Sequence, residues 1–143
     1  MNRSDWMLLA IDAAGAQGLS PVQLQKALFL LGKAAPEAIG DQWYEFKPYH
    51  YGPFDRAVYV EAERSSKKGE IEVSQRDGEN WNRYAITRDG EIRVSYILRE
   101  TPAATVTYLG QLVAWVQAQT FQALVTAIYA KYPEMRANSV FQG

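Results

Sequence analysis

The chain has no cysteine and only one histidine, His50. The absence of cysteine excludes disulfide bonds, thiol chemistry and cysteine-ligated zinc. With a single imidazole, a histidine-based catalytic triad or a multi-histidine metal site would have to use His50. The HExxH, Walker-type and GxGxxG patterns are also missing from the sequence. We therefore expect no enzymatic activity, no metal and no cofactor.

Long apolar runs are missing as well, since no stretch approaches the roughly 18 to 20 apolar residues that cross a bilayer. Residues 1–6 carry a charge pair and then an amphipathic pattern, rather than the apolar core of a secretion signal. We therefore expect a cytoplasmic protein without membrane association. The 143 residues are 48% hydrophobic and 22% charged, which is typical of one globular domain. We place this domain at residues 1–136 and a C-terminal tail at 137–143.

The chain also lacks an excess of positive charge, with a formal net charge of −1 and a pI of about 5.8. Nucleic-acid-binding proteins usually carry a basic field, because neutralising phosphates supplies much of their affinity. The overall charge therefore does not favour a nucleic-acid partner, and any DNA-binding prediction depends on local clusters of cations.

The segment Tyr44–Phe54 stands out among the residues that are present. Five of its eleven residues are aromatic, which is more apolar surface than a solvated linker carries. Its two prolines and Gly52 are incompatible with a helix. We predict an irregular, packed segment that sets the angle between the flanking helices, with a brief strand at Trp43–Phe46. We interpret the His50 side chain as hydrogen-bonded inside this segment, because buried polar groups are usually paired.

Capping signals and apolar spacing predict three helices in the first half of the chain. Ser4 is the expected N-cap of the first helix, and Asp55 that of the third. The expected helices run from Ser4 to Gly15 or Gly18, from Ser20–Pro21 to Gly32 or Pro36, and over Arg56–Lys68.

Alternating apolar residues predict a β-hairpin from Ile71–Val73 and Trp81–Ile86, joined by a turn at Arg76–Asn80. The segment Glu91–Arg99 suits either a helix or a strand. Two more helices are expected, over Ala104–Gln119 with Thr105 as a possible cap, and from Thr120 to Tyr132–Pro133.

Three helices followed by a hairpin is the element order of a winged helix. We therefore predict an α+β, mainly helical fold, with a winged-helix-like core of three helices plus a β-hairpin and two added C-terminal helices. A DNA-binding winged helix would place its third helix in the major groove. The candidate DNA-binding residues on that helix are Arg56, Arg64, Lys67 and Lys68.

Local charge gives this DNA-binding prediction little support. Residues 55–68 carry a net charge of +1, whereas residues 70–93, which include the hairpin, carry −2. A wing that touches phosphates should not be acidic. The pair Lys67–Lys68 equally suits the solvated end of a helix.

Aromatic residues indicate a second possible function. Tyrosine and tryptophan are favoured at protein interfaces, and the chain has more of them than a core of this size requires. A partner protein is therefore as well supported as DNA. Tyr108, Trp115 and Tyr129 on the last helices are candidates for a homodimer interface. The candidate partner-binding residues are Tyr49, Tyr51, Phe54, Arg56 and Tyr59.

Four parts of the chain form a recognisable set, and the Tyr-Gly-Pro-Phe run at positions 51–54 is the most specific of them. These parts are Leu24–Leu31, Phe46–Phe54 with Val58–Tyr59, Tyr84–Gly90, and Tyr129–Glu134 followed by Asn138–Ser139. Together they resemble the Panacea superfamily, which includes SocA-like antitoxins and YwgA-like proteins, over roughly residues 20 to 134.

The resemblance implies a mainly helical domain that binds another protein, typically a toxin that it neutralises. SocA-like members act as adaptors that deliver the toxin to a protease. We hypothesise a non-enzymatic protein-binding module, an antitoxin or phage-defence component, whose surface lies around Tyr44–Tyr59. The alternative is a winged-helix transcriptional regulator.

Overall fold

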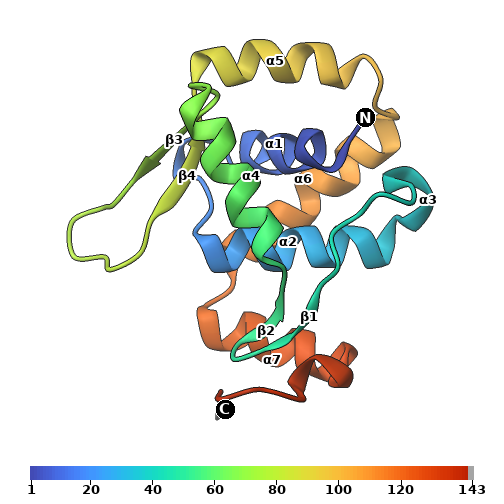
Figure 1. Ribbon diagram of the computed structural model, residues 1–143, viewed down its shortest axis with the longest axis vertical. Helices are drawn as coiled ribbons and strands as arrows, with labels where there is room; N and C mark the ends of the chain where they lie inside the picture. Colours follow the sequence, from blue (N-terminus) through green and yellow to red (C-terminus); the bar gives the residue numbers. More distant parts are fainter. Residues whose placement is uncertain (142–143) are drawn as a thin grey trace.

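The computed structural model describes residues 1–141, and helices make up most of them (Figure 1). Two short antiparallel β-hairpins complete an α+β fold, which confirms the predicted fold class. The α-helices are α1 (Arg3–Ala13), α2 (Pro21–Ala34), α3 (Pro36–Ile39), α4 (Arg56–Lys67), α5 (Arg88–Leu98), α6 (Ala103–Ala118) and α7 (Phe121–Lys131). The 3-10 helices are η1 (Gly15–Gln17) and η2 (Pro133–Arg136), and the strands are β1 (Lys47–Tyr49), β2 (Gly52–Phe54), β3 (Ile71–Ser74) and β4 (Arg83–Ile86).

Most helix starts follow their capping residues, as expected for side chains that satisfy the free N–H groups of the first turn. Ser20, Asp55 and Thr120 cap α2, α4 and α7 as predicted. Two predicted caps are wrong. Asn2, not Ser4, caps α1, because its Oδ1 accepts the backbone N–H of Asp5 at 2.9 Å. Helix α6 follows Pro102 and has no side-chain cap, so Thr105 does not cap it.

Helices α1 and α2 form the centre of the core. In Figure 1, α5 lies on one side of α1 and α2 lies on the other, while α6 packs against both central helices. Side chains such as Trp6, Ile11, Leu24, Leu28 and Val113 are almost fully buried. Burying an apolar side chain of this size contributes about 1.5–3 kcal/mol, so this central cluster supplies much of the stabilisation.

The β3–β4 hairpin is joined to the helical core through Leu19, two residues before α2 begins. Leu19 and Tyr84 exchange two backbone hydrogen bonds of 3.0 and 2.8 Å. Gly18 has a φ of +67°, and a Cβ there would collide with the carbonyl of Tyr84. Only glycine therefore permits this close approach. The winged-helix assignment itself stays a prediction.

The aromatic segment forms a small hairpin, which corrects the predicted irregular structure. Pro48 pairs with Pro53 in the centre of β1–β2, and Gly52 adopts a φ of +104°. The predicted strand at Trp43–Phe46 is wrong, since no strand begins before Lys47. Gln42 to Phe46 instead leads into the hairpin, with Tyr44 buried beneath it.

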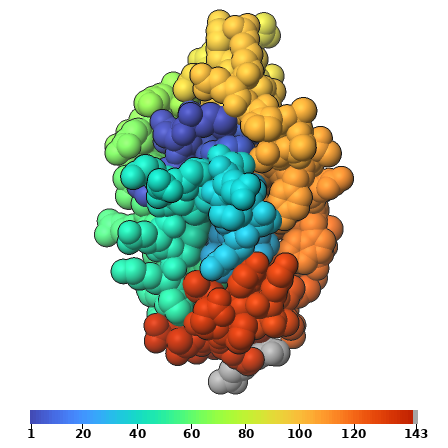
Figure 2. Space-filling model, turned by 90° about the vertical axis from the view of Figure 1, so that its right-hand side faces the viewer, coloured from blue at the N-terminus to red at the C-terminus, as the bar shows by residue number. Residues whose placement is uncertain are grey.

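Three helices, α5, α6 and α7, follow the β3–β4 hairpin, one more than expected. The segment that suited either a helix or a strand is a helix, because Thr87 caps it and its buried residues Val94 and Ile97 lie on one face. After η2, residues 137–141 run alongside β1–β2, and Figure 2 shows the C-terminal segment packed against this part of the chain. Residues 142–143 of the predicted tail lie outside the described residues. None of the helices among residues 1–141 has the length and apolarity to span a membrane.

Candidate functional site

The β1–β2 hairpin is supported from beneath by Gln25 of α2. This side chain is 1% exposed, and its amide makes two hydrogen bonds with the backbone of Asp55. Gln25 Nε2 donates to the Asp55 carbonyl at 2.9 Å, and the Asp55 N–H donates to Gln25 Oε1 at 3.0 Å. Because an amide clamp of this kind satisfies both backbone groups, it fixes the junction between β2 and α4.

Lys26 lies next to Gln25 and directly under the hairpin. Its side chain is buried, and its Nζ donates to the Pro53 carbonyl at 3.4 Å. Burial lowers the pKa of Lys26 to about 8, because the charged ammonium loses its hydration. No carboxylate among residues 1–141 lies within 4.0 Å of this ammonium. Contact between Lys26 and the hairpin is therefore made at the cost of removing the charged ammonium from water.

The C-terminal segment holds the other side of the hairpin. The amide of Asn138 donates to the Pro48 carbonyl at 3.2 Å, and the Val140 N–H donates to the His50 carbonyl at 2.9 Å. The Ser139 hydroxyl donates to the same carbonyl at 3.3 Å and accepts a hydrogen bond of 2.7 Å from the Tyr129 hydroxyl. Both strands of the hairpin are thus fixed by chain segments that are remote in sequence.

A buried polar cluster joins the approach to the hairpin with α1 and α4. The Glu61 carboxylate accepts hydrogen bonds from the Tyr44 hydroxyl and, at 2.7 Å, from Arg3 Nε. The Arg3 guanidinium also lies 4.8 Å from the centre of the Tyr44 ring. Burial and the Glu61 carboxylate raise the pKa of Tyr44 well above its usual range, so the hydroxyl stays protonated.

The outer surface of the hairpin carries a continuous run of rings. Tyr49 stacks on His50 at 4.3 Å and on Phe54 at 5.0 Å, and Phe54 meets Tyr59 edge-on at 5.3 Å. Tyr49 is 49% exposed. The predicted buried hydrogen bond of His50 is wrong, because its side chain is exposed and stacked on a tyrosine. The backbone carbonyl of His50, rather than its ring, accepts hydrogen bonds from Val140 and Ser139.

Two of these rings, Tyr49 and Phe54, border a groove of about 720 Å³, which we call the hairpin groove. Its lining includes Arg3, Trp43, Tyr49, Phe54 and Arg56. The groove therefore combines aromatic faces with guanidinium groups, and these are the residue types that contribute most at protein interfaces.

The charges around the hairpin groove are mixed. The lining contains the cations Lys47 and Arg56 as well as the acids Asp41 and Glu45. Asp55 also lines the groove, but its carboxylate accepts the backbone N–H groups of Glu45 at 2.7 Å and Ala57 at 2.8 Å. With no dominant sign of charge, the groove suits a partner segment that is itself of mixed charge.

The structure brings together three of the five predicted partner-binding residues, namely Tyr49, Phe54 and Arg56. Tyr51 is exposed but lies elsewhere, where its ring meets Phe121 edge-on at 5.3 Å. Tyr59 is only half-buried and borders a different pocket, so it supports the hairpin groove through its contact with Phe54 rather than lining it.

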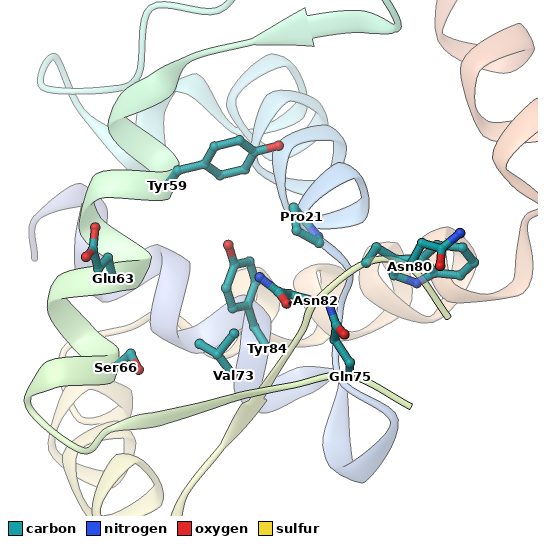
Figure 3. A pocket seen from close by; sticks show the side chains of 10 residues that line it. Pro21, Tyr59, Glu63, Ser66, Val73, Gln75, Asn80, Asn82 and Tyr84 are labelled. Carbon is teal, nitrogen blue, oxygen red and sulfur yellow. Dashed lines mark hydrogen bonds between the residues drawn. The ribbon is translucent and has the colours of Figure 1, made fainter. Parts of the chain in front are cut away.

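That second pocket, of about 590 Å³, lies between α4 and the β3–β4 hairpin. Figure 3 shows Tyr59 from α4 and Tyr84 from β4 projecting into the same space, with Val73 of β3 beside them. Burial raises the pKa of Tyr59 and raises that of Tyr84 to about 12. Both hydroxyls therefore stay protonated at neutral pH.

The predicted DNA-binding residues lie at two ends of α4. Arg56 is in the hairpin groove, whereas Arg64 and Lys68 line a small crevice of about 100 Å³ together with acidic side chains, Glu61 and Glu70 among them. Lys67 pairs with Glu63 at 3.5 Å, with both side chains exposed. The four cations therefore do not form one patch.

Of the three residues predicted for a homodimer interface, two are exposed and one is buried. Tyr108 and Trp115 are exposed on α6, but Tyr129 is buried at 5% exposure. The prediction of Tyr129 as a surface residue is therefore wrong. Its hydroxyl instead donates a hydrogen bond to Ser139 in the C-terminal segment.

Sequence reasoning did not identify Gln25 or Ser139 as site residues. The signal for Gln25 was its position beside Lys26 within the apolar run Leu24–Leu31. Two adjacent polar residues on a buried helix face require partners, and the structure provides them in Pro53 and Asp55. Ser139 had no such signal, because its role depends on where the C-terminal segment lies.

Searches of protein-family models, of curated proteins and of solved structures each found no match to this chain. The part of the chain that the structure describes contains no group of three or more histidine, aspartate or glutamate side chains arranged to hold a metal ion.

Proposed function

We propose that this protein is a protein-binding module that contacts its partner through the hairpin groove. The observation that supports this proposal most is the combination of an exposed aromatic run with a rigid support. Tyr49 is half exposed, yet the hairpin that carries it is hydrogen-bonded to α2 and to the C-terminal segment.

Rigid support favours binding, because side chains that are already ordered lose little conformational entropy when a partner arrives. Tyr49 is held between His50 and Phe54, and the backbone on either side of it is hydrogen-bonded. Tyrosine and arginine are also the residues most often found as interaction hot spots. Tyr49 and Arg56 are therefore the expected anchors for the partner.

The resemblance to the Panacea superfamily suggests what the partner is. We infer that it is a toxin, which this protein neutralises or delivers to a protease. The Tyr-Gly-Pro-Phe run and the Lys26, Asn138 and Ser139 positions of the resemblance all meet at this hairpin. This convergence supports a role for the shared residues in holding the binding surface.

The test is partner capture from cells that naturally make the protein, with a photo-crosslinking residue at position 42, which lines the hairpin groove and is unchanged in every variant. We expect one protein to be crosslinked by the otherwise wild-type chain. The double variant Tyr49→Ala, Arg56→Ala should recover that protein at least tenfold less, since each hot-spot residue typically contributes 2 kcal/mol or more, or about thirtyfold in affinity. Binding constants would then be measured with the purified pair.

The chain offers a matched control on α5. There the Arg99 guanidinium lies 4.9 Å from the centre of the Tyr96 ring, and Tyr96 is exposed. The double variant Tyr96→Ala, Arg99→Ala removes the same two residue types far from the hairpin and should leave capture unchanged. Equal recovery by both double variants, with unchanged thermal melting, would remove the hairpin groove from the mechanism.

One observation favours a second function, DNA binding by α4. Burial of Glu61 against Arg3 removes an acidic residue from the solvent-facing charge of this helix. The exposed charged residues between positions 56 and 68 are then four cations and one acid, which gives a net charge of +3. They are Arg56, Glu63, Arg64, Lys67 and Lys68. Gel-shift with the protein's own upstream DNA tests this function, and replacing Lys67 and Lys68 should reduce the dependence of binding on salt.

A further inference from the structure

A pocket of about 650 Å³ is lined by residues from the start of α2, the β3–β4 hairpin and the junction of α6 with α7. Figure 1 shows where these parts of the chain lie. Its lining includes Trp81 and Arg83 of the hairpin, Gln23 of α2, Gln117 of α6 and Phe121 of α7. Its size is within the range of pockets that hold small organic ligands. The partner-binding proposal makes no use of these residues.

Two aromatic rings border this pocket. Trp81 is 49% exposed and Phe121 is 45% exposed. Phe121 is held in place by edge-on contacts with Tyr51 and Phe141. Exposed rings beside a cavity provide flat apolar faces on which another planar ring can stack.

The charge within the pocket is balanced. Arg83 is the one charged residue in the lining, and Glu79 accepts hydrogen bonds from both its Nε, at 3.0 Å, and its Nη2, at 2.8 Å. The Glu79 carboxylate therefore balances the charge of Arg83, although Arg83 Nη1 is buried without a hydrogen-bond partner among the described residues. A phosphate or carboxylate would have to compete with Glu79 for this guanidinium, so the pocket favours an uncharged ligand.

Two glutamine side chains supply fixed hydrogen-bonding groups. Gln117 Nε2 donates to the carbonyls of Ala14 and Gly18 at 2.9 and 3.0 Å, so its Oε1 remains as an acceptor. Gln23 Oε1 accepts the Ser20 N–H at 2.8 Å, so its Nε2 remains as a donor. Because half of each amide is bound to the backbone, the orientation of the other half is set in advance.

We propose that this pocket binds a nucleobase, stacked on Trp81 and hydrogen-bonded along its edge by Gln23 and Gln117. A base is planar and uncharged, and its edge carries donors and acceptors side by side, which a pair of oriented amides matches. A saccharide matches less well, because its many hydroxyl donors favour carboxylate acceptors and no carboxylate lines this pocket. The base can belong to a free nucleoside or to a single-stranded nucleic acid.

The first arm of the test titrates the full chain with adenosine, guanosine, cytidine and uridine by calorimetry, with methyl glucoside as the saccharide probe. We expect saturable binding of at least one nucleoside. Binding should be insensitive to salt and no tighter for the corresponding monophosphate. Trp81→Ala should weaken binding about tenfold or more, since stacking of one base contributes ~1–3 kcal/mol. Trp115→Ala removes a comparably exposed tryptophan of another pocket and should have no effect.

Gln23→Glu tests the amide without disturbing the fold. Glutamate at this position keeps the oxygen that accepts the Ser20 N–H and completes an ordinary capping box, but it has no N–H donor. We expect unchanged thermal melting and at least tenfold weaker nucleoside binding. Normal binding by both Gln23→Glu and Trp81→Ala would overturn the proposal.

The second arm uses ten-nucleotide single-stranded DNA and RNA to distinguish the source of the base. Tighter binding of an oligonucleotide than of its nucleoside, lost in Trp81→Ala, would support the nucleobase site and assign it to nucleic acid. Binding of the nucleoside alone would assign it to free nucleosides. Absence of binding in both arms, or binding of methyl glucoside in place of nucleosides, would overturn the proposal.

Discussion

Gln25 and Lys26 are adjacent on the buried face of α2, and they differ in how completely their polar groups are satisfied. The amide of Gln25 forms two good hydrogen bonds with the Asp55 backbone. The ammonium of Lys26 has one long hydrogen bond, to the Pro53 carbonyl. A buried charge with so little compensation is destabilising, and the lowered pKa of Lys26 expresses the same free energy.

We predict that the protein becomes more stable as the pH rises from 8 to 10. The pKa of Lys26 is about 8 in the folded state and 10.5 without burial, so the unfolded chain binds more protons between these values. Stability must then increase with pH in this window, by at most ~1.4 kcal/mol per pH unit. Above pH 10 the trend should reverse, because the raised pKa values of Tyr44 and Tyr84 favour the unfolded chain once tyrosine can ionise there.

Urea denaturation at pH 7, 8, 9 and 10 measures this effect. Lys26→Met should remove the rise between pH 8 and 10, since methionine fills a similar volume without a charge. Lys33→Met, on the exposed side of the same helix, should keep the wild-type profile. A rise of the same size in Lys26→Met would show that another group is responsible.

At the scale of elements, the β1–β2 hairpin does not stabilise itself. Each strand has three residues, and the central pair, Pro48 and Pro53, has no backbone N–H to donate. Two-stranded hairpins are marginal in water even without this loss. The hairpin is therefore stable because α2 and the C-terminal segment bind it from two sides.

Gly52→Ala should destabilise the protein by about 1–3 kcal/mol, because an alanine at a φ of +104° is strained. A Cβ at this position would lie 3.5 Å from Lys26 Cε, which is ordinary contact, so the backbone conformation alone accounts for the loss. Chemical denaturation gives the free energy of unfolding.

Gly110→Ala provides the control, since this glycine lies inside α6 with open space around it. Alanine there should stabilise the protein by roughly 0.5–1 kcal/mol through its higher helix propensity. Equal changes in both variants would mean that the strained turn is not what makes Gly52 necessary.

At the scale of the whole molecule, the cluster of Arg3, Tyr44 and Glu61 joins three parts of the chain. Arg3 begins α1, Tyr44 precedes the β1–β2 hairpin, and Glu61 lies in the middle of α4. The Glu61 side chain is 9% exposed, so its charge depends on these partners for compensation.

Arg3→Met should destabilise the protein by roughly 1–3 kcal/mol, because it leaves a buried carboxylate without its cation. We take the lower part of the range for buried pairs, since Arg3 itself is 35% exposed. Adding Glu61→Gln should recover part of the loss by removing the charge. Thermal and chemical denaturation of the single and double variants form the required cycle.

A matched control lies nearby on the surface. Arg93 pairs with Asp5 at 3.2 Å, and its side chain is 48% exposed. Arg93→Met should change the free energy of unfolding by less than about 1 kcal/mol, as expected for a solvated pair.

Additive losses in the Arg3→Met, Glu61→Gln double variant would contradict the idea that Glu61 needs its partner.

The sequence by itself determined the features that depend on neighbours a few residues away. Ser20, Asp55 and Thr120 begin helices because a side-chain oxygen reaches a backbone N–H two or three residues later. The β3–β4 hairpin and the mainly helical α+β class follow from apolar spacing and turn residues in the same way. The Asp55 cap was therefore predictable, although its clamp by Gln25 was not.

Only the tertiary structure decided which side chains meet. Tyr44 and Tyr49 belong to one aromatic segment, yet the first is buried against Glu61 and the second is exposed in the hairpin groove. That difference arises because α4 supplies a partner for Tyr44, while α2 and the C-terminal segment hold the hairpin from two sides, the latter from positions up to 90 residues away. Burial depends on such distant contacts, so no local pattern of residues encodes it.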